Sequence, residues 1–164
     1  MHPTGLAHLV CAAAALFSGA GIVATPKGTP RHRQMGRIYG LSMLGLNVTA
    51  LLIYRLSGAL GPFHVAALLS LLTVIAGVIA VVTRRPQGTW LTLHANFMSW
   101  SYVGLLAAAA AEAATRIPAA PFWGMVVVAS LAVFAVGGYL VITRIPRVLS
   151  NAFSRRALPR PCST

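Results

Sequence analysis

The sequence has almost no acidic residues. It contains thirteen Lys and Arg residues but a single carboxylate side chain, Glu112, and only 9% of its 164 residues are charged. An ordinary soluble domain is about 25% charged and stays dispersed through a coat of both signs. This chain cannot form such a coat, so a soluble globular domain is excluded.

The shortage of carboxylates also excludes several kinds of chemistry. Most glycosidases need two acids, a serine triad needs an acid to orient its histidine, and Mg²⁺ and Ca²⁺ sites need several anionic oxygens. Proton pumps usually relay protons through acids inside the membrane. One chain with one acid cannot assemble these sites alone. Its chemistry must come from His, Cys, Met, Tyr, Ser, Asn or a bound cofactor.

The sequence is rich in long apolar segments. Hydrophobic residues make up 57% of the chain, and the mean hydropathy is +0.78. Apolar runs of roughly 20 residues are long enough to cross a bilayer as helices. We find five of them, at 5–25, 37–54, 63–83, 91–112 and 122–143. They predict an all-α polytopic membrane bundle with five transmembrane helices, the first four forming the core and the fifth packing outside.

Two of the predicted helices carry clear start signals. Thr29 is a typical N-cap with Pro30 at the first helical position, so the second helix is expected to start before its apolar run. Gly61 and Pro62 mark the start of the third helix. At the end of the fourth, Glu112 and Arg116 have the spacing of a local ion pair.

Positive charge is distributed unequally between the two sides of the predicted bundle. All but two of the Lys and Arg residues, Arg55 and Arg116, fall on the side of the first loop, the third loop and the C-terminal tail. The positive-inside rule then places the N-terminus outside and the C-terminus in the cytoplasm. Residues 1–143 form the transmembrane domain and residues 144–164 a basic cytoplasmic tail.

The expected partners follow from the same distribution. The basic clusters are separated by membrane spans and lack interleaved aromatic residues, which argues against nucleic acid. Anionic headgroups of the inner leaflet are the simpler partner, because each basic residue near the surface gains about 1 kcal/mol there. A homo-oligomer or a membrane partner subunit remains open.

The histidines are the most informative polar residues. Four lie at the mouths of predicted spans, and the topology sorts them into two pairs. His8 and His64 are at the outer side, and His32 and His94 are at the inner side. His2 lies on the outer tail.

Neighbouring residues share helical faces with the inner histidines. On the second helix, residues spaced three and four apart place His32 on one face with Gly36, Tyr39, Gly40, Met43 and Asn47. Gly36 and Gly40 form a small-residue seam that lets another helix or a flat cofactor come close. On the fourth helix, His94 shares a face with Met98, Ser101 and Tyr102.

Three interpretations of the histidines remain open. In the first, each pair holds haem b, with His32 and His94 as the first choice of ligands and His8 and His64 as the second. Two such sites would carry electrons across the bilayer. The inner propionates would then meet basic residues, namely Arg31, Arg33, Arg84 and Arg85.

The second interpretation is a smaller transition metal, and the third is structural. Imidazole, thiol and thioether ligands suit copper or zinc. The candidate sets are His8, Cys11 and His64 outside, and His32, His94 and Met98 inside. Structural histidines would instead bond loop backbone or lipid phosphate, as in a non-enzymatic transporter or partner-binding membrane subunit.

Two short stretches resemble a known family. These are His32-Arg33-x-x-Gly36-x-x-Tyr39 and His94-x-x-Phe97-Met98-x-x-Ser101-Tyr102, together with His8. They resemble a family of small bacterial multipass proteins described only as predicted membrane proteins of unknown function, over about residues 5–110. The resemblance implies a helical bundle with these histidines as its site. Paired histidines in a bundle are also similar in architecture to b561-type cytochromes.

Overall fold

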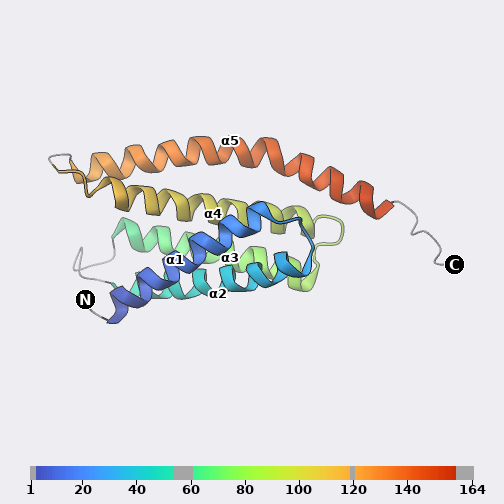
Figure 1. The fold of residues 1–164 in the computed structure, drawn as a ribbon, viewed down its shortest axis with the longest axis horizontal. Coiled ribbons are helices and arrows are strands. Elements are labelled where there is room, and N and C mark those ends of the chain that lie inside the picture. Colours follow the sequence, from blue (N-terminus) through green and yellow to red (C-terminus); the bar gives the residue numbers. More distant parts are fainter. Residues whose placement is uncertain (1–2, 54–60, 119–120, 158–164) are drawn as a thin grey trace.

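The chain folds into five α-helices in the computed structural model. The structure describes residues 3–53, 61–118 and 121–157, with side chains up to Ser150. The helices are α1 (Pro3–Ala24), α2 (Pro30–Leu52), α3 (Pro62–Thr83), α4 (Trp90–Ala114) and α5 (Phe122–Ala157) (Figure 1). The predicted all-α bundle of five helices is confirmed.

The starts of α2 and α3 follow from local capping. The Thr29 hydroxyl accepts a hydrogen bond from the His32 amide at 3.2 Å, and Pro30 occupies the first turn, where its missing N–H costs nothing. Gly61 caps α3, and its amide donates to Nδ1 of His64 at 3.1 Å. Both predicted helix starts are confirmed.

Helices α1 to α4 form a ring, and α5 lies outside it. Along the ring, each helix packs against the next, and α4 closes the ring on α1. Helix α5 packs on α4 (Figure 1). Two diagonals therefore cross the ring, one from α1 to α3 and the other from α2 to α4. The predicted four-helix core with an outer fifth helix is confirmed.

The core of the ring is small and tightly packed. Its fully buried side chains come from all four helices and are Ala15, Tyr39, Met43, Leu46, Val74 and Leu105. Glycines allow the helices to approach closely at several contacts. A Cβ on Gly19 of α1 would lie 2.2 Å from Cε2 of Tyr102 on α4, and a Cβ on Gly77 of α3 would lie 2.8 Å from Sδ of Met98.

The outer surface carries many large apolar side chains, as expected of a protein solvated by lipid. Large side chains that face outward include Phe17, Leu41, Val82 and Ile142, each about 70% exposed or more. Helices α1, α3 and α5 are long and apolar enough to cross a membrane. A soluble protein could not leave such a surface in water.

Helices α2 and α4 are not among these apolar candidates, although five spans were predicted. Their lengths of 23 and 25 residues match a span, but both carry polar residues on their inner faces. Asn47 and Ser101 are buried, and α2 begins with three arginines. Inward polar faces lower the hydropathy of a helix without exposing polar atoms to lipid.

Helix α5 is longer than expected. It continues past the predicted end at Thr143 as far as Ala157, with Pro146 inside it. A proline removes one backbone hydrogen bond and often bends a helix without ending it.

Close packing at Gly19 gives a direct test of the ring. We expect Gly19→Ala to lower the free energy of unfolding by about 1–3 kcal/mol, because the new methyl group overlaps the Tyr102 ring. Gly104→Ala is the matched control, since a Cβ there meets nothing within 4 Å. Thermal unfolding in detergent micelles measures both variants, and equal stabilities would contradict the packing.

Candidate functional site

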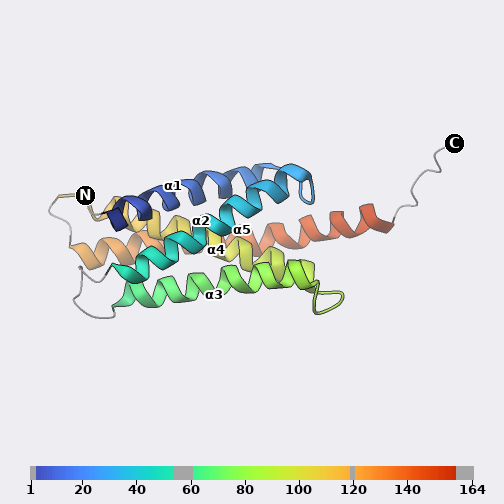
Figure 2. The same ribbon diagram turned by 90° about the horizontal axis from the view of Figure 1, so that it is seen from below.

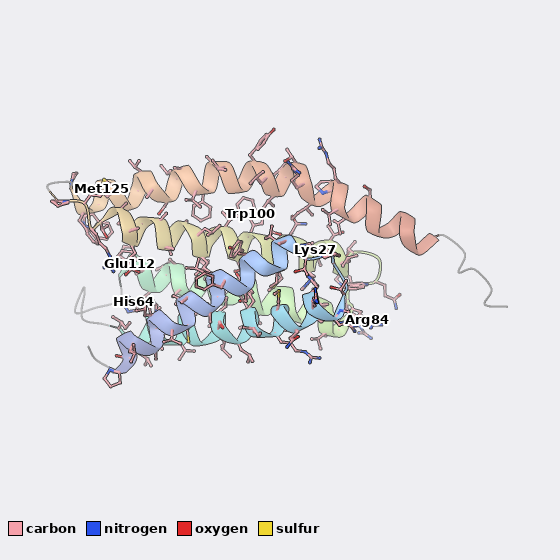
Figure 3. The ribbon with its side chains drawn as sticks, in the orientation of Figure 1. Lys27, His64, Arg84, Trp100, Glu112 and Met125 are labelled. Carbon is pink, nitrogen blue, oxygen red and sulfur yellow. The ribbon has the colours of Figure 1, made fainter. Side chains whose placement is uncertain are left out.

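The four histidines lie at opposite ends of the ring, two at each end. His32 and His94 lie near the end where α2 and α4 begin, which we call the basic end because it carries Lys27, Arg31, Arg33, Arg84 and Arg85. His64 and Glu112 lie at the other end, away from Lys27 and Arg84 (Figure 3). His8, in the first turns of α1, belongs to that far end as well.

The His94 ring is held by a backbone carbonyl of the neighbouring helix. Its Nδ1 lies 2.8 Å from the Gly77 carbonyl oxygen of α3. A carbonyl only accepts hydrogen bonds, so Nδ1 carries the proton and donates it. In neutral His94, the lone pair is therefore on Nε2. Histidines that bind metals are typically oriented in this way, by a hydrogen bond from the other ring nitrogen.

The His32 ring is the least satisfied polar group at the basic end. Its Nδ1 is buried and finds no hydrogen-bond partner among the described residues. Burial lowers the pKa of His32 below its usual 6.5, and the charges of Lys27 and His94 lower it further. His32 is therefore neutral at physiological pH, and the His94 ring lies close enough to influence it.

The glycine seam of α2, formed by Gly36 and Gly40, lies on the same helical face as His32. A Cβ on Gly36 or Gly40 would meet no atom within 4 Å. Toward the basic end, α2 leans away from α3 and toward α1 (Figure 2). Packing within the described chain therefore gives no reason for glycine at either position.

Arginines without an acidic partner border the same part of α2. Pro30, Arg33, Gln34 and Arg37 line an open stretch of the surface of α2. The chain's one carboxylate side chain, Glu112, is bound to Arg116 at 2.8 Å at the far end, as predicted. No acidic side chain of the described residues therefore neutralises the basic end.

The histidines at the far end bond to neighbouring structure. Thr49 of α2 donates its hydroxyl proton to the Gly45 carbonyl at 2.8 Å, so its oxygen accepts from Nδ1 of His8 at 3.0 Å. This bond joins α1 to α2. In His64, Nδ1 accepts from the Gly61 amide, so neutral His64 carries its proton on Nε2.

The structure therefore treats the two predicted pairs differently. His32 and His94 lie on α2 and α4, and positive charge on His94 would lower the pKa of His32. His8 and His64 lie on the other diagonal, on α1 and α3, and bond to Thr49 and Gly61. No group of three or more His, Cys, Asp or Glu side chains within 3–53, 61–118 and 121–157 is arranged to hold a metal ion. Haem or metal binding by either pair stays a prediction, and His2 lies outside the described residues.

Sequence reasoning missed the groups that hold the histidines in place. Neither the Gly77 carbonyl nor Thr49 belongs to a motif with any histidine. The Tyr39 and Ser101 hydroxyls, 2.8 Å apart in the core, were placed on the correct faces but not paired with each other. One signal was present, because each follows a histidine of the inner pair by seven residues.

The lowered pKa of His32 predicts a pH dependence of stability. Below pH 6.5 the unfolded chain takes up a proton at this residue more readily than the folded chain does. We expect the free energy of unfolding to fall as the pH falls through this range, and His32→Gln to reduce the fall. Thermal unfolding from about pH 8 to about pH 5.5 measures it. An unchanged slope in the variant would contradict the burial of a neutral imidazole.

Comparison with known proteins gives one match. No curated protein and no solved structure matches the chain significantly, so the likeness to b561-type cytochromes gains no support. A family model matches residues 5–149, which extends the predicted resemblance into α5. The chain therefore belongs to the family described as "Predicted membrane protein (DUF2306)", a family of membrane proteins of unknown function.

Proposed function

We propose that the protein is a membrane redox protein that holds one haem b at the basic end, between His32 and His94. The observation that carries the proposal is the hydrogen bond from His94 to the Gly77 carbonyl, which leaves Nε2 as the electron-pair donor. A bis-histidine haem supplies one-electron transfer when bound. The residues of this chain supply the ligands, their orientation and the surrounding charge.

The state of both imidazoles supports the proposal. Ligand histidines must be neutral, and burial and neighbouring positive charge keep His32 neutral. Its Nδ1 is buried without a partner, and such an atom usually has a specific reason to be there. A nearby iron is one such reason, provided that the ring turns to present the nitrogen.

The shape of α2 also suits a flat group. Because a Cβ at Gly36 or Gly40 would meet nothing, a planar macrocycle has access to the backbone there. Two glycines one turn apart make this access continuous along the helix.

Charge at the basic end favours haem over a bare metal ion. A divalent cation would be repelled by Lys27, Arg31 and Arg33, with no carboxylate of this chain's described residues nearby to offset them. Haem b carries two propionates, which such residues attract. Each exposed pair contributes only about 0.2–1 kcal/mol, but it also fixes the orientation of the group.

The alternative function, a non-enzymatic transporter or partner-binding subunit with structural histidines, is supported at the far end. His8 joins α1 to α2, and His64 caps α3. We therefore assign these two histidines a structural role and restrict the cofactor to the basic end.

We further propose that the basic end faces the cytoplasm of a bacterial inner membrane and contacts anionic headgroups. The support is the gathering of cations: every described Lys and Arg side chain except Arg116 lies toward this end. Cytoplasmic loops carry this excess in other membrane proteins.

Haem titration tests the proposed site. We expect the purified chain in detergent to bind one haem b, with a Soret absorbance typical of two imidazole ligands. His94→Ala and His32→Ala should each weaken binding at least 10–100-fold. His8→Ala is the matched control and should bind haem as the wild type does. Wild-type protein that binds no haem, or equal loss in all three variants, would overturn the proposal.

Gly36→Leu separates haem from a bare metal ion. The leucine meets no protein atom at its Cβ, so the fold should be retained. It fills the access for a macrocycle, and we expect haem binding to fall about tenfold or more, as for other groups that support a metal site. Binding of Zn²⁺ or Cu²⁺ to the apoprotein, measured by calorimetry, should not fall in parallel. An unaffected haem affinity would show that the seam is not part of the site.

A reporter fusion tests the orientation. Enzymes that are active only in the cytoplasm should work when fused after Thr164, and those active only outside should not. The reverse pattern would contradict the proposed orientation, and Arg84 and Arg85 are then the residues to exchange.

A further inference from the structure

A hydrogen bond crosses the middle of the ring from α2 to α4. The Tyr39 and Ser101 hydroxyl oxygens are 2.8 Å apart, and the two residues are 1% and 3% exposed. The backbones of α2 and α4 do not pack against each other, because the two helices lie on a diagonal. This bond therefore links two helices that are otherwise held only through their neighbours and through side chains in the core.

The direction of the bond follows from the proton count. Ser101 donates its single hydroxyl proton to the Met98 carbonyl at 3.0 Å. Its oxygen must then accept, so the Tyr39 hydroxyl is the donor. Inside an apolar bundle without water, a hydroxyl has few other partners. The bond thus holds the end of the Tyr39 side chain at the height of Ser101.

The sequence relates this bond to the inner histidines. Tyr39 follows His32 by seven residues, and Ser101 follows His94 by seven residues. Helices α2 and α4 both start at the basic end and run in the same direction (Figure 1). Two turns correspond to about 10.5 Å along each helix. The Tyr39–Ser101 hydrogen bond holds these two residues at the same depth in the membrane. His32 and His94 each lie two turns nearer the basic end, so they also share one depth.

We infer that Tyr39 and Ser101 are positioning residues for His32 and His94. Their hydrogen bond sets the register of α2 against α4, so that both imidazoles reach the same planar group. The role of this register in aligning the two imidazoles for a cofactor rests on the proposed function. The register itself is a property of the fold and can be measured without any cofactor.

The chain supplies a matched control in Tyr102. Its hydroxyl donates to the Leu16 carbonyl of α1 at 3.3 Å, and its ring meets the Tyr39 ring edge-on. Tyr102→Phe removes a hydroxyl from the same core but leaves the link between α2 and α4 intact. Tyr39→Phe removes that link, and Ser101 keeps its bond to Met98.

Cross-linking measures the register directly. In the full chain with Cys11→Ala and Cys162→Ser, the substitutions His32→Cys and His94→Cys place thiols at the two positions. We expect a short bifunctional alkylating reagent to join them rapidly. Adding Tyr39→Phe should slow the reaction several-fold, and adding Tyr102→Phe should not. Equal rates with and without Tyr39→Phe would overturn the inference.

Haem binding gives the second readout. In the otherwise unmodified chain, Tyr39→Phe and Ser101→Ala should each weaken haem b binding about tenfold. Both should also reduce the share of bis-imidazole spectrum at saturation. Tyr102→Phe should leave both quantities unchanged. Circular dichroism and size-exclusion chromatography identify any variant that fails to fold. If either Tyr39→Phe or Ser101→Ala fails to fold, the other variant tests the inference.

The two proposals fail in distinguishable ways. A wild-type chain that binds no haem, together with cross-linking as described in the chain with His32→Cys and His94→Cys, would refute the proposed function and keep the register. A chain that binds haem, with affinity and spectrum unchanged in both Tyr39→Phe and Ser101→Ala, would keep the proposed function and refute the positioning role.

Discussion

The hydrogen bond from His94 to the Gly77 carbonyl is the contact on which the proposed site depends. It joins α3 to α4 at 2.8 Å and settles which nitrogen of the ring can bind a ligand. Gly77 makes the contact by being small, because a Cβ there would overlap Met98, one turn beyond His94 on the same face. A larger residue would push α4 away and remove the bond. Gly77 of α3 thus determines which ring nitrogen of His94, on α4, carries the proton.

The other polar contacts of the ring follow from the need to pair buried polar groups within the protein. Inside a membrane, each buried hydroxyl, amide and imidazole must find its partner within the protein. Asn47 donates to the Met43 carbonyl, Ser18 to the Ala14 carbonyl, and Tyr39 to Ser101. The buried Nδ1 of His32 has no hydrogen-bond partner among the described residues. It lies on the same helix as the glycine seam and as arginines that have no acidic partner. A bound group there would give the nitrogen a partner and the arginines a counter-charge.

The sequence predicted the elements of this fold better than their contacts. Length and hydropathy indicated five helices, Thr29 and Pro30 indicated the start of α2, and the spacing of Glu112 and Arg116 indicated their ion pair. These features depend on residues near one another in the chain. The partners of His8 and His94 come from other helices, and helix rotation and tilt decide them. Helix periodicity gave the face of Gly36 and Gly40 but not that α2 leans away from α3 there. The length of α5 was also missed, because the apolar run that predicted it ends at Thr143 while the helix continues to Ala157.

Mass measurement of the intact protein tests the central claim most directly. The full chain would be purified from bacterial membranes in mild detergent and kept folded in the mass spectrometer. We expect the mass of one chain with one haem b, and the mass of the chain alone when His94 is replaced by alanine. A wild-type chain that carries no haem, or one that keeps its haem after the replacement, would contradict the account.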